Sequence, residues 1–102
     1  MLLEIAEIEV RPGAEDQFAK AMRETGVPHL AACEGVVTAS FGRGVENPSK
    51  FTFNVVWKSM EAHQGARDLP AFGKFRAAFG DLTVGGAMSH YEMDEALSGP
   101  SA

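Results

Sequence analysis

Histidine and arginine side chains set among aromatic residues are the groups in this sequence that could do chemistry. His63 lies six residues beyond Trp57, and Arg76 directly follows Phe75. A neutral imidazole can take a proton near neutral pH, because its ordinary pKa is about 6.5. A guanidinium can stabilise the oxyanion that develops when such a proton leaves. We therefore predict that His63 is a general base and that Arg76 stabilises the anion.

Each of these residues also has a purely structural interpretation. Trp57 ends an apolar run and can be simply a core residue. His63 can lie exposed on a helix, and an arginine within an apolar stripe commonly extends its head group to solvent. Spacing alone does not separate these interpretations from the chemical ones.

Aromatic side chains are expected to form the walls of a binding site. Residues 51–57 alternate large apolar side chains, which is typical of a half-buried strand. Phe72, Phe75 and Phe79 step by three and four positions, which is typical of one helix face. A row of rings on the strand would then face a row on the helix, with a small aromatic molecule bound between them. The rings predicted to bind it are Phe53, Trp57, Phe72 and Phe75.

Two polar residues near the end of the chain are further candidates for the site. His90 and Tyr91 are adjacent on a predicted strand, so only one of them can face the helices. A bulge expected near Gly85 leaves the choice between them open. Either could supply a second polar group for substrate binding, or could have a structural role only.

The sequence spacing gives no expectation of a metal or a cofactor. The three histidines and Cys33 show neither HxxxH nor CxxC spacing. Residues 42–44, Gly-Arg-Gly, lack the third glycine and the strand-to-helix setting of a dinucleotide-binding loop. We therefore expect a site without metal and a reaction without a cofactor.

Length and composition are those of one globular domain. The chain has 102 residues, with 9 basic and 14 acidic side chains and a formal charge of −5. This balance, without a basic cluster, argues against nucleic acid or an anionic membrane as partner. A single cysteine and the lack of a long apolar run predict a cytoplasmic protein. We expect one domain over residues 1–94 and a flexible tail over residues 95–102.

Hydrophobic patterns predict elements in the order β-α-β-β-α-β. The predicted strands cover residues 2–10, 36–42, 51–57 and 82–93. Helical stretches are predicted over residues 14–25, kinked or interrupted at Gly26 and Pro28, and over residues 59–79, interrupted near Pro70. This order predicts an α+β, ferredoxin-like fold, with a four-stranded antiparallel sheet and both helices on one face.

The second face of this sheet would have no helices over it. Small or mildly polar side chains are expected there, namely Thr38, Ser40, Thr52, Asn54, Ala87 and Ser89. A bare sheet face that also carries apolar residues seldom stays in water. We therefore predict a two-fold homodimer through the sheet faces; the alternative is a monomer with a hydrated face.

Several short motifs resemble the antibiotic biosynthesis monooxygenase family. They are the Trp-Lys-Ser-Met-Glu-Ala-His segment at 57–63, the Phe-Gly-Lys-Phe segment at 72–75, the Val-Arg-Pro-Gly segment at 10–13 and Glu34-Gly35. The resemblance covers residues 2–93. It implies a dimeric α+β barrel with a cavity in each protomer, and characterised members oxygenate polycyclic phenols or anthrones without metal or prosthetic group. Other members degrade haem.

The sequence departs from the family pattern at two positions. The oxygenases carry an asparagine on the same strand face as the tryptophan, whereas Asn54 is three positions from Trp57 and Phe53 holds the in-phase position. Haem-degrading relatives need a histidine shortly after the phenylalanine pair, where this chain has Arg76. A haem site is therefore not expected.

These observations lead to a first hypothesis and two alternatives. The first is a cofactor-independent monooxygenase acting on an electron-rich aromatic compound such as a phenol, quinol or anthrone. A non-catalytic small-ligand-binding or accessory protein on the same scaffold is the second. The third is an isomerase-like proton transfer, which needs only the same base.

Overall fold

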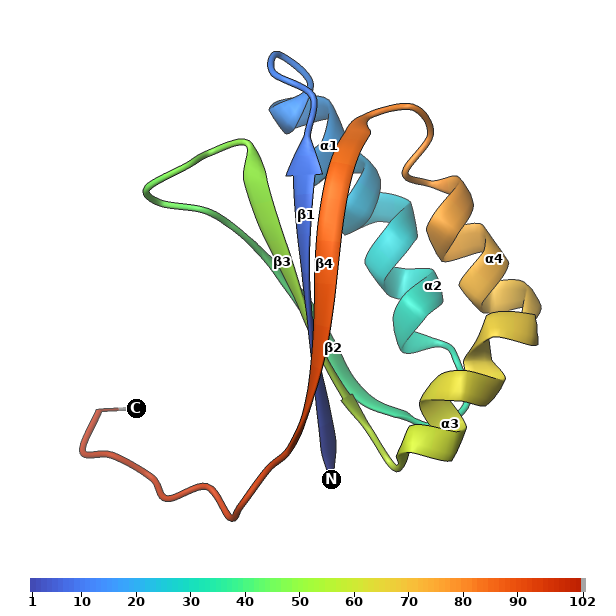
Figure 1. Cartoon of the computed structure of the whole chain (residues 1–102), viewed down its shortest axis with the longest axis vertical. Helices are drawn as coiled ribbons and strands as arrows, with labels where there is room; N and C mark the ends of the chain where they lie inside the picture. The colour runs from blue at the N-terminus through green and yellow to red at the C-terminus, as the bar shows by residue number, and fades with distance from the viewer. Residues whose placement is uncertain (102) are drawn as a thin grey trace.

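The computed structural model describes residues 1–101, whereas Ala102 lies outside them. The strands are β1 (Leu2–Val10), β2 (Val36–Arg43), β3 (Lys50–Trp57) and β4 (Thr83–Glu92). The helices are α1 (Glu15–Ala21), α2 (Val27–Ala31), α3 (Met60–Gly65) and α4 (Pro70–Ala77). A π-helical turn, η1 (Met22–Gly26), joins α1 to α2, and a 3₁₀ turn, η2 (Ala66–Asp68), joins α3 to α4. Figure 1 shows these elements along the chain.

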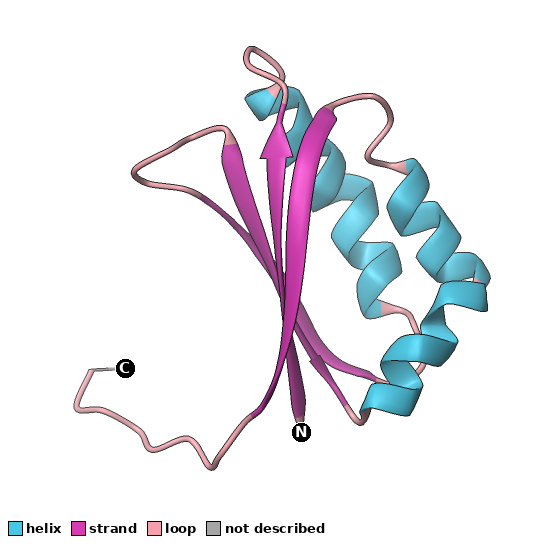
Figure 2. Ribbon diagram, viewed as in Figure 1, coloured by secondary structure: helices cyan, strands magenta, loops and turns pink. Residues whose placement is uncertain are grey.

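The four strands form one antiparallel sheet in the order β2-β3-β1-β4. All the helices lie on one face of it (Figure 2). The predicted ferredoxin-like fold is therefore confirmed. The predicted interruption of the first helical stretch takes the form of the π-helical turn, since the chain stays helical from Glu15 to Ala31.

The interface between sheet and helices is built from aromatic rings. Phe51, Phe53 and Trp57 of β3 point toward the helices and are buried. The ring of Phe18 on α1 meets that of Phe51 with centroids 5.0 Å apart, and Phe75 on α4 meets Phe53 at 5.5 Å. Strand alternation thus places every second residue of β3 in the core, as the sequence pattern predicts.

The register of β4 decides which of its side chains face the helices. Its pairing with β1 shifts by one residue between Glu9 and Val10, near the predicted bulge. A side chain at Gly86 would place its Cβ 2.9 Å from the carbonyl oxygen of Glu7, so a glycine is needed for this close approach. Beyond the shift, His90 pairs with Glu4, whereas Tyr91 pairs with Leu3.

The outer sheet face carries the small and polar residues that the sequence predicts. Thr38, Ser40, Asn54, Ala87 and Ser89 are exposed, and Thr52 is partly exposed. Partly exposed apolar side chains lie among them, namely Leu3, Ile5 and Val56. This face therefore combines polar and apolar groups without a covering layer within residues 1–101.

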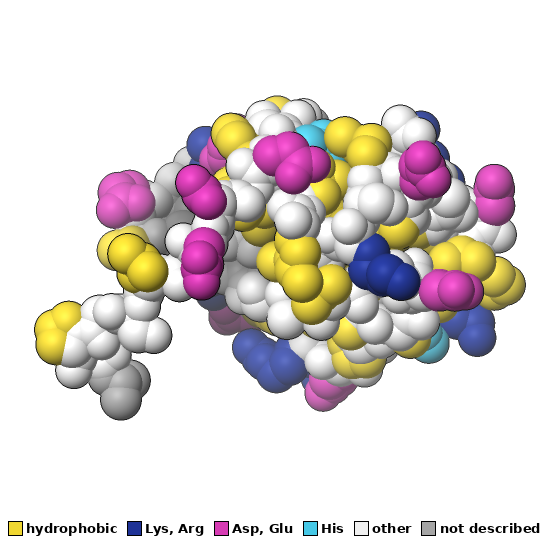
Figure 3. All heavy atoms as spheres, turned by 90° about the horizontal axis from the view of Figure 1, so that it is seen from below, with side chains coloured by type: hydrophobic (Ala, Val, Ile, Leu, Met, Phe, Trp, Pro, Cys, Tyr) yellow, Lys and Arg dark blue, Asp and Glu magenta, His cyan; other side chains and the backbone are white. Residues whose placement is uncertain are grey.

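The C-terminal segment and the surface complete the fold. Residues 93–101 carry no regular secondary structure, and the flexible tail over residues 95–102 stays a prediction. Figure 3 shows this segment extending from the domain, and basic side chains interspersed with acidic ones on the face in view. No helix within residues 1–101 is both long and apolar enough to cross a membrane. The cellular location stays a prediction.

Candidate active site

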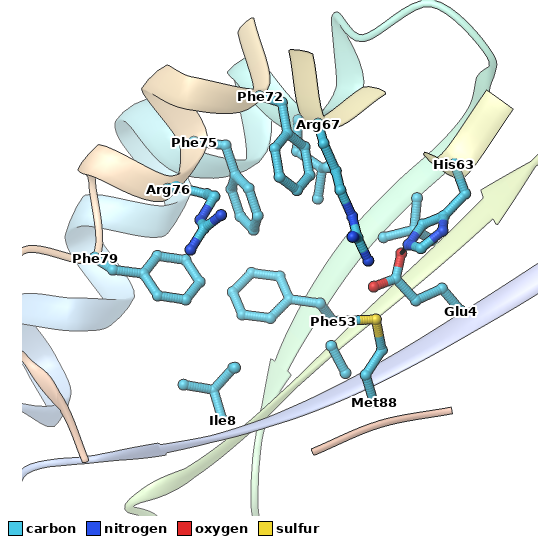
Figure 4. Close-up of a pocket in the computed structure, with 13 residues that line it drawn as sticks. Glu4, Ile8, Phe53, His63, Arg67, Phe72, Phe75, Arg76, Phe79 and Met88 are labelled. Atoms are coloured by element: carbon cyan, nitrogen blue, oxygen red, sulfur yellow. Dashed lines mark ion pairs between the residues drawn. The ribbon is translucent and has the colours of Figure 1, made fainter. Parts of the chain in front are cut away.

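A cavity of about 310 Å³ lies between the sheet and the helical layer. Phe72, Phe75 and Phe79 line it from the α4 side, and Phe53 lines it from β3 (Figure 4). A volume of this size is at the lower end of the range for small-molecule sites. Three of the four predicted aromatic wall residues, Phe53, Phe72 and Phe75, therefore line a cavity.

His63 is held at one end of this cavity by the start of α3. The hydroxyl of Ser59 accepts a hydrogen bond from the Ala62 backbone N–H at 3.1 Å, which caps the helix one turn before the histidine. His63 as a whole is only 6% exposed, and it lines the cavity. Its ring lies edge-on to Trp57, with centroids 5.3 Å apart. The sequence prediction that these two residues meet at the corner is therefore correct.

Glu4 is a site residue that the sequence analysis missed. Its side chain is buried, with the residue 8% exposed, and it lines the cavity from β1. Oε1 accepts a hydrogen bond from Trp57 Nε1 at 2.9 Å and lies 3.4 Å from His63 Nε2. The sequence could have indicated this position, because Glu4 lies two residues from Leu2 and from Ala6 and therefore points to the same, helix-covered face of β1.

His90 completes a cluster with these two residues, which we call the Glu4–His63–His90 cluster. Its Nε2 atom lies 3.3 Å from His63 Nε2, and the two ring centroids are 4.5 Å apart. His90 is therefore the member of the adjacent pair that faces the helices. Tyr91 lies on the opposite sheet face and is 50% exposed, so it does not line this cavity.

Burial lowers the pKa of His63 below its ordinary value of 6.5. The carboxylate of Glu4 acts in the opposite direction, whereas His90 and Arg67 add to the lowering. His63 is therefore neutral at pH 7, and its contact with Glu4 becomes an ion pair only on protonation. His63 Nδ1 is buried and has no hydrogen-bond partner within residues 1–101.

Two guanidinium groups reach the same cavity. Arg76 lines it from α4 beside Phe79, although the residue as a whole is exposed. Arg67 on η2 was missed, because it precedes the predicted break at Pro70 and belongs to no apolar stripe. Figure 4 shows the Arg67 side chain extending toward Glu4 and Phe53, and Arg76 lying beside the ring of Phe79.

Trp57, unlike the other predicted wall residues, lies outside the cavity. Its side chain is fully buried and is not among the residues that line the cavity. The indole instead contacts Glu4 and His63 and holds the carboxylate in place. Asn54 is exposed on the outer sheet face, as its strand phase predicts, and Phe53 takes the inward position.

The fold has close counterparts among solved structures. A candidate antibiotic biosynthesis monooxygenase from Bordetella bronchiseptica is 24% identical, with a TM-score of 0.82 over 92% of this chain and 97% of that one. One from Deinococcus radiodurans is 14% identical, with a TM-score of 0.79 over 99% and 100% of the two chains. SnoaB, described as a cofactor-independent oxygenase from Streptomyces nogalater, is 18% identical, with a TM-score of 0.77 over 98% and 97%.

At such identities these structures establish the shared fold, and family membership rests on the sequence match. No curated protein matches the sequence significantly. The family described as antibiotic biosynthesis monooxygenase matches residues 1–78, which is most of the chain. This chain therefore belongs to the antibiotic biosynthesis monooxygenase family.

Proposed function

We propose that this protein is a cofactor-independent monooxygenase for an electron-rich aromatic compound, such as a phenol, a quinol or an anthrone. The observation that carries the proposal is the composition of one cavity. Phenylalanine rings form most of its wall, and a buried histidine paired with a carboxylate lies at one end. Flat apolar ligands fit between such rings, while the polar groups can act on one ionisable position.

Oxygenation without a cofactor requires the substrate itself to reduce O₂. Loss of a proton gives a phenolate or carbanion, which can pass one electron to O₂. The resulting radical pair combines into a hydroperoxide, and loss of water from it leaves a ketone or quinone. One oxygen atom of O₂ enters the product, and the other leaves as water. The protein must then bind the substrate away from water, take the proton and stabilise the anion.

His63 is the proposed base. It is neutral at pH 7, it lines the cavity, and Glu4 at 3.4 Å would face the imidazolium that forms after proton transfer. General base catalysis of this kind contributes about 10²–10⁴-fold to a rate. Glu4 thus orients and stabilises the histidine, and Trp57 holds Glu4.

Arg76 and Arg67 are the proposed anion-stabilising groups. Both side chains line the cavity, and a guanidinium directed into a space walled by rings acts more strongly than one in water. Arg67 also lies close enough to His63 to lower its pKa. A phenol oxygen bound between His63 and a guanidinium would be held by the base before proton transfer. After proton transfer, the guanidinium would hold it as the phenolate.

The homodimer through the outer sheet faces remains part of this proposal. Leu3, Ile5 and Val56 are partly exposed on that face, next to Tyr91. Packing a second copy against the face would remove these apolar side chains from water. The cavity opens on the other side of the sheet, so each protomer would keep its own site.

The test uses untagged protein that has been freed of metal with EDTA. Oxygen uptake is measured with a panel of phenols, hydroquinones and anthrones, and the product formed under ¹⁸O₂ is analysed by mass spectrometry. The proposal expects one ¹⁸O atom per product molecule at a rate above that of the protein-free solution. Thermal stabilisation by these compounds without any oxygen uptake would instead select the non-catalytic ligand-binding function.

A further inference from the structure

We propose that Glu4, His63 and His90 form a binding site for a divalent first-row transition metal ion such as Zn²⁺ or Co²⁺. The spacing of these residues along the sequence gave no expectation of a metal. Strand pairing and the start of α3 nevertheless bring them together from three separate elements. The proposal goes beyond the oxygenase function, because it concerns ion binding that can be measured without turnover.

Two of the three distances within the cluster are those of ligands around one ion. Glu4 Oε1 lies 3.4 Å from His63 Nε2, and His63 Nε2 lies 3.3 Å from His90 Nε2. One ligand atom from each residue lies within 4.8 Å of the other two. Two ligands that each lie about 2.1 Å from a tetrahedral ion are separated by about 3.4 Å. The observed spacing therefore needs little rearrangement for an ion to enter.

The ligand types select a class of metal. Two imidazole nitrogens and one carboxylate oxygen suit Zn²⁺, Co²⁺ and Fe²⁺, whereas Ca²⁺ and Mg²⁺ prefer oxygen ligands only. A set of two histidines and one carboxylate leaves further coordination positions open. Glu4 and His63 both line the cavity, so those positions can face a bound molecule.

A single proton between the two imidazoles can serve only one of the two short contacts of His63 Nε2. Two Nε2 atoms 3.3 Å apart form a hydrogen bond only if one of them carries a proton. That proton cannot also point straight at Glu4 Oε1, which lies 3.4 Å from His63 Nε2. A cation placed between the three atoms can accept a lone pair from each of them at once.

One residue behind the cluster, Trp57, acts as the outer partners of metal ligands do. Trp57 Nε1–H donates to Glu4 Oε1 at 2.9 Å, which fixes the carboxylate and leaves a second lone pair on that oxygen. Such outer partners hold ligands in position, and their loss typically weakens metal binding 10–100-fold. Two of the three ligands sit on adjacent, hydrogen-bonded strands, so the site is built on rigid elements.

Metal binding and proton transfer would exclude each other at His63. An ion coordinated by Nε2 occupies the lone pair that faces Glu4 and His90. In the proposed oxygenase the cluster must be free to take the substrate's proton. We therefore expect the metal-bound protein to be inactive as an oxygenase and the EDTA-treated protein to be active.

The test is a titration of the untagged, EDTA-treated full-length protein with Co²⁺, followed by visible absorption spectroscopy and by competition with Zn²⁺. We expect one Co²⁺ per chain, with the absorption bands of a low-coordinate site that Zn²⁺ abolishes. His63→Ala and His90→Ala should each weaken binding at least tenfold. His29→Ala, which removes a partly buried histidine of α2, should leave binding unchanged.

His90 lies at the sheet edge and is only partly buried, so its variant keeps the test valid if the His63 variant does not fold. Circular dichroism checks the fold of each variant. Absence of a stoichiometric Co²⁺ complex overturns the proposal, and so does binding that survives His90→Ala in a folded protein. Added Zn²⁺ should also slow oxygen uptake, and EDTA should restore it. Stoichiometric binding together with no oxygenation in either form would uphold the metal site and reject the oxygenase function.

Discussion

The indole N–H of Trp57 donates a hydrogen bond to the buried carboxylate of Glu4 at 2.9 Å, joining the ends of β3 and β1. A buried carboxylate is costly unless such partners compensate for its lost hydration. The same carboxylate lies 3.4 Å from His63. The hydrogen bond between Trp57 and Glu4 therefore stabilises the fold and also positions the carboxylate beside His63, the proposed base.

Removing this hydrogen bond should lower stability. Trp57→Phe leaves Glu4 Oε1 without its indole donor and opens a space in the core, and we expect the free energy of unfolding to fall by about 2–4 kcal/mol. Urea unfolding followed by circular dichroism measures the change. Val45→Ala, at a side chain that is 89% exposed in the loop between β2 and β3, should change the stability by less than about 0.5 kcal/mol. A Trp57→Phe variant as stable as the natural protein would contradict the role of the contact.

The two guanidinium groups should act on the rate of the reaction. Arg76→Gln and Arg67→Gln each remove a positive charge from the cavity, and we expect kcat to fall about 10²-fold, as for the loss of an oxyanion donor. Steady-state oxygen uptake separates kcat from KM. Arg23→Gln, on the exposed side of η1, serves as the control. A rise in KM alone would show that the arginine binds the substrate but does not stabilise the anion.

The outer sheet face should mediate dimerisation. The natural protein is expected to sediment at twice the mass of the 10.9 kDa chain. Ile5→Lys places a charge in the middle of the proposed interface and should give monomers, because burying an unpaired charge is unfavourable. Gln17→Lys on exposed α1 should leave the dimer intact. Analytical ultracentrifugation decides the matter, and a monomeric natural protein at micromolar concentration would contradict the interface.

Glu15 should make stability depend on pH in the acidic range. The hydroxyl of Ser49 donates to its carboxylate at 2.6 Å and the Gly13 N–H donates at 2.8 Å, which lowers the pKa of Glu15 below 4.5. A lowered folded-state pKa means that the stabilisation is present above pH 4.5 and is lost as the pH falls through the folded value. Glu15→Gln should therefore lower Tm at pH 7, and the Tm difference should shrink at a lower pH, below the folded-state pKa of Glu15. A Tm difference that persists at the lower pH would contradict this assignment.

Much of the fold could be predicted from local patterns, since alternation in residues 51–57 and the three-four spacing of Phe72, Phe75 and Phe79 report directly on burial. The predicted β-α-β-β-α-β order and the position of His63 at a corner follow from the same signals. The π-helical turn found in place of a break packs Gly26 against α4, where an added Cβ would lie 3.6 Å from Phe75 Cδ1. Local sequence does not contain that contact.

The cluster could be predicted only in part, because its members meet through strand pairing. Glu4, His63 and His90 are far apart in the sequence, and their proximity depends on the register between β1 and β4. That register depends on the shift at Glu9 and Val10, which left the choice between His90 and Tyr91 open. Arg67 gave no pattern at all, since a short 3₁₀ turn has no periodicity that shows which side chain points inward.

Oxygen consumption by EDTA-treated His63→Ala, compared with His29→Ala, tests the proposed function most directly. Both variants lose one imidazole, but only His63 lies in the cavity beside Glu4. We predict that His63→Ala lowers kcat with an anthrone or hydroquinone by about 10²–10⁴-fold and that His29→Ala leaves it unchanged. Equal rates for the two folded variants would contradict the assignment of His63 as the base.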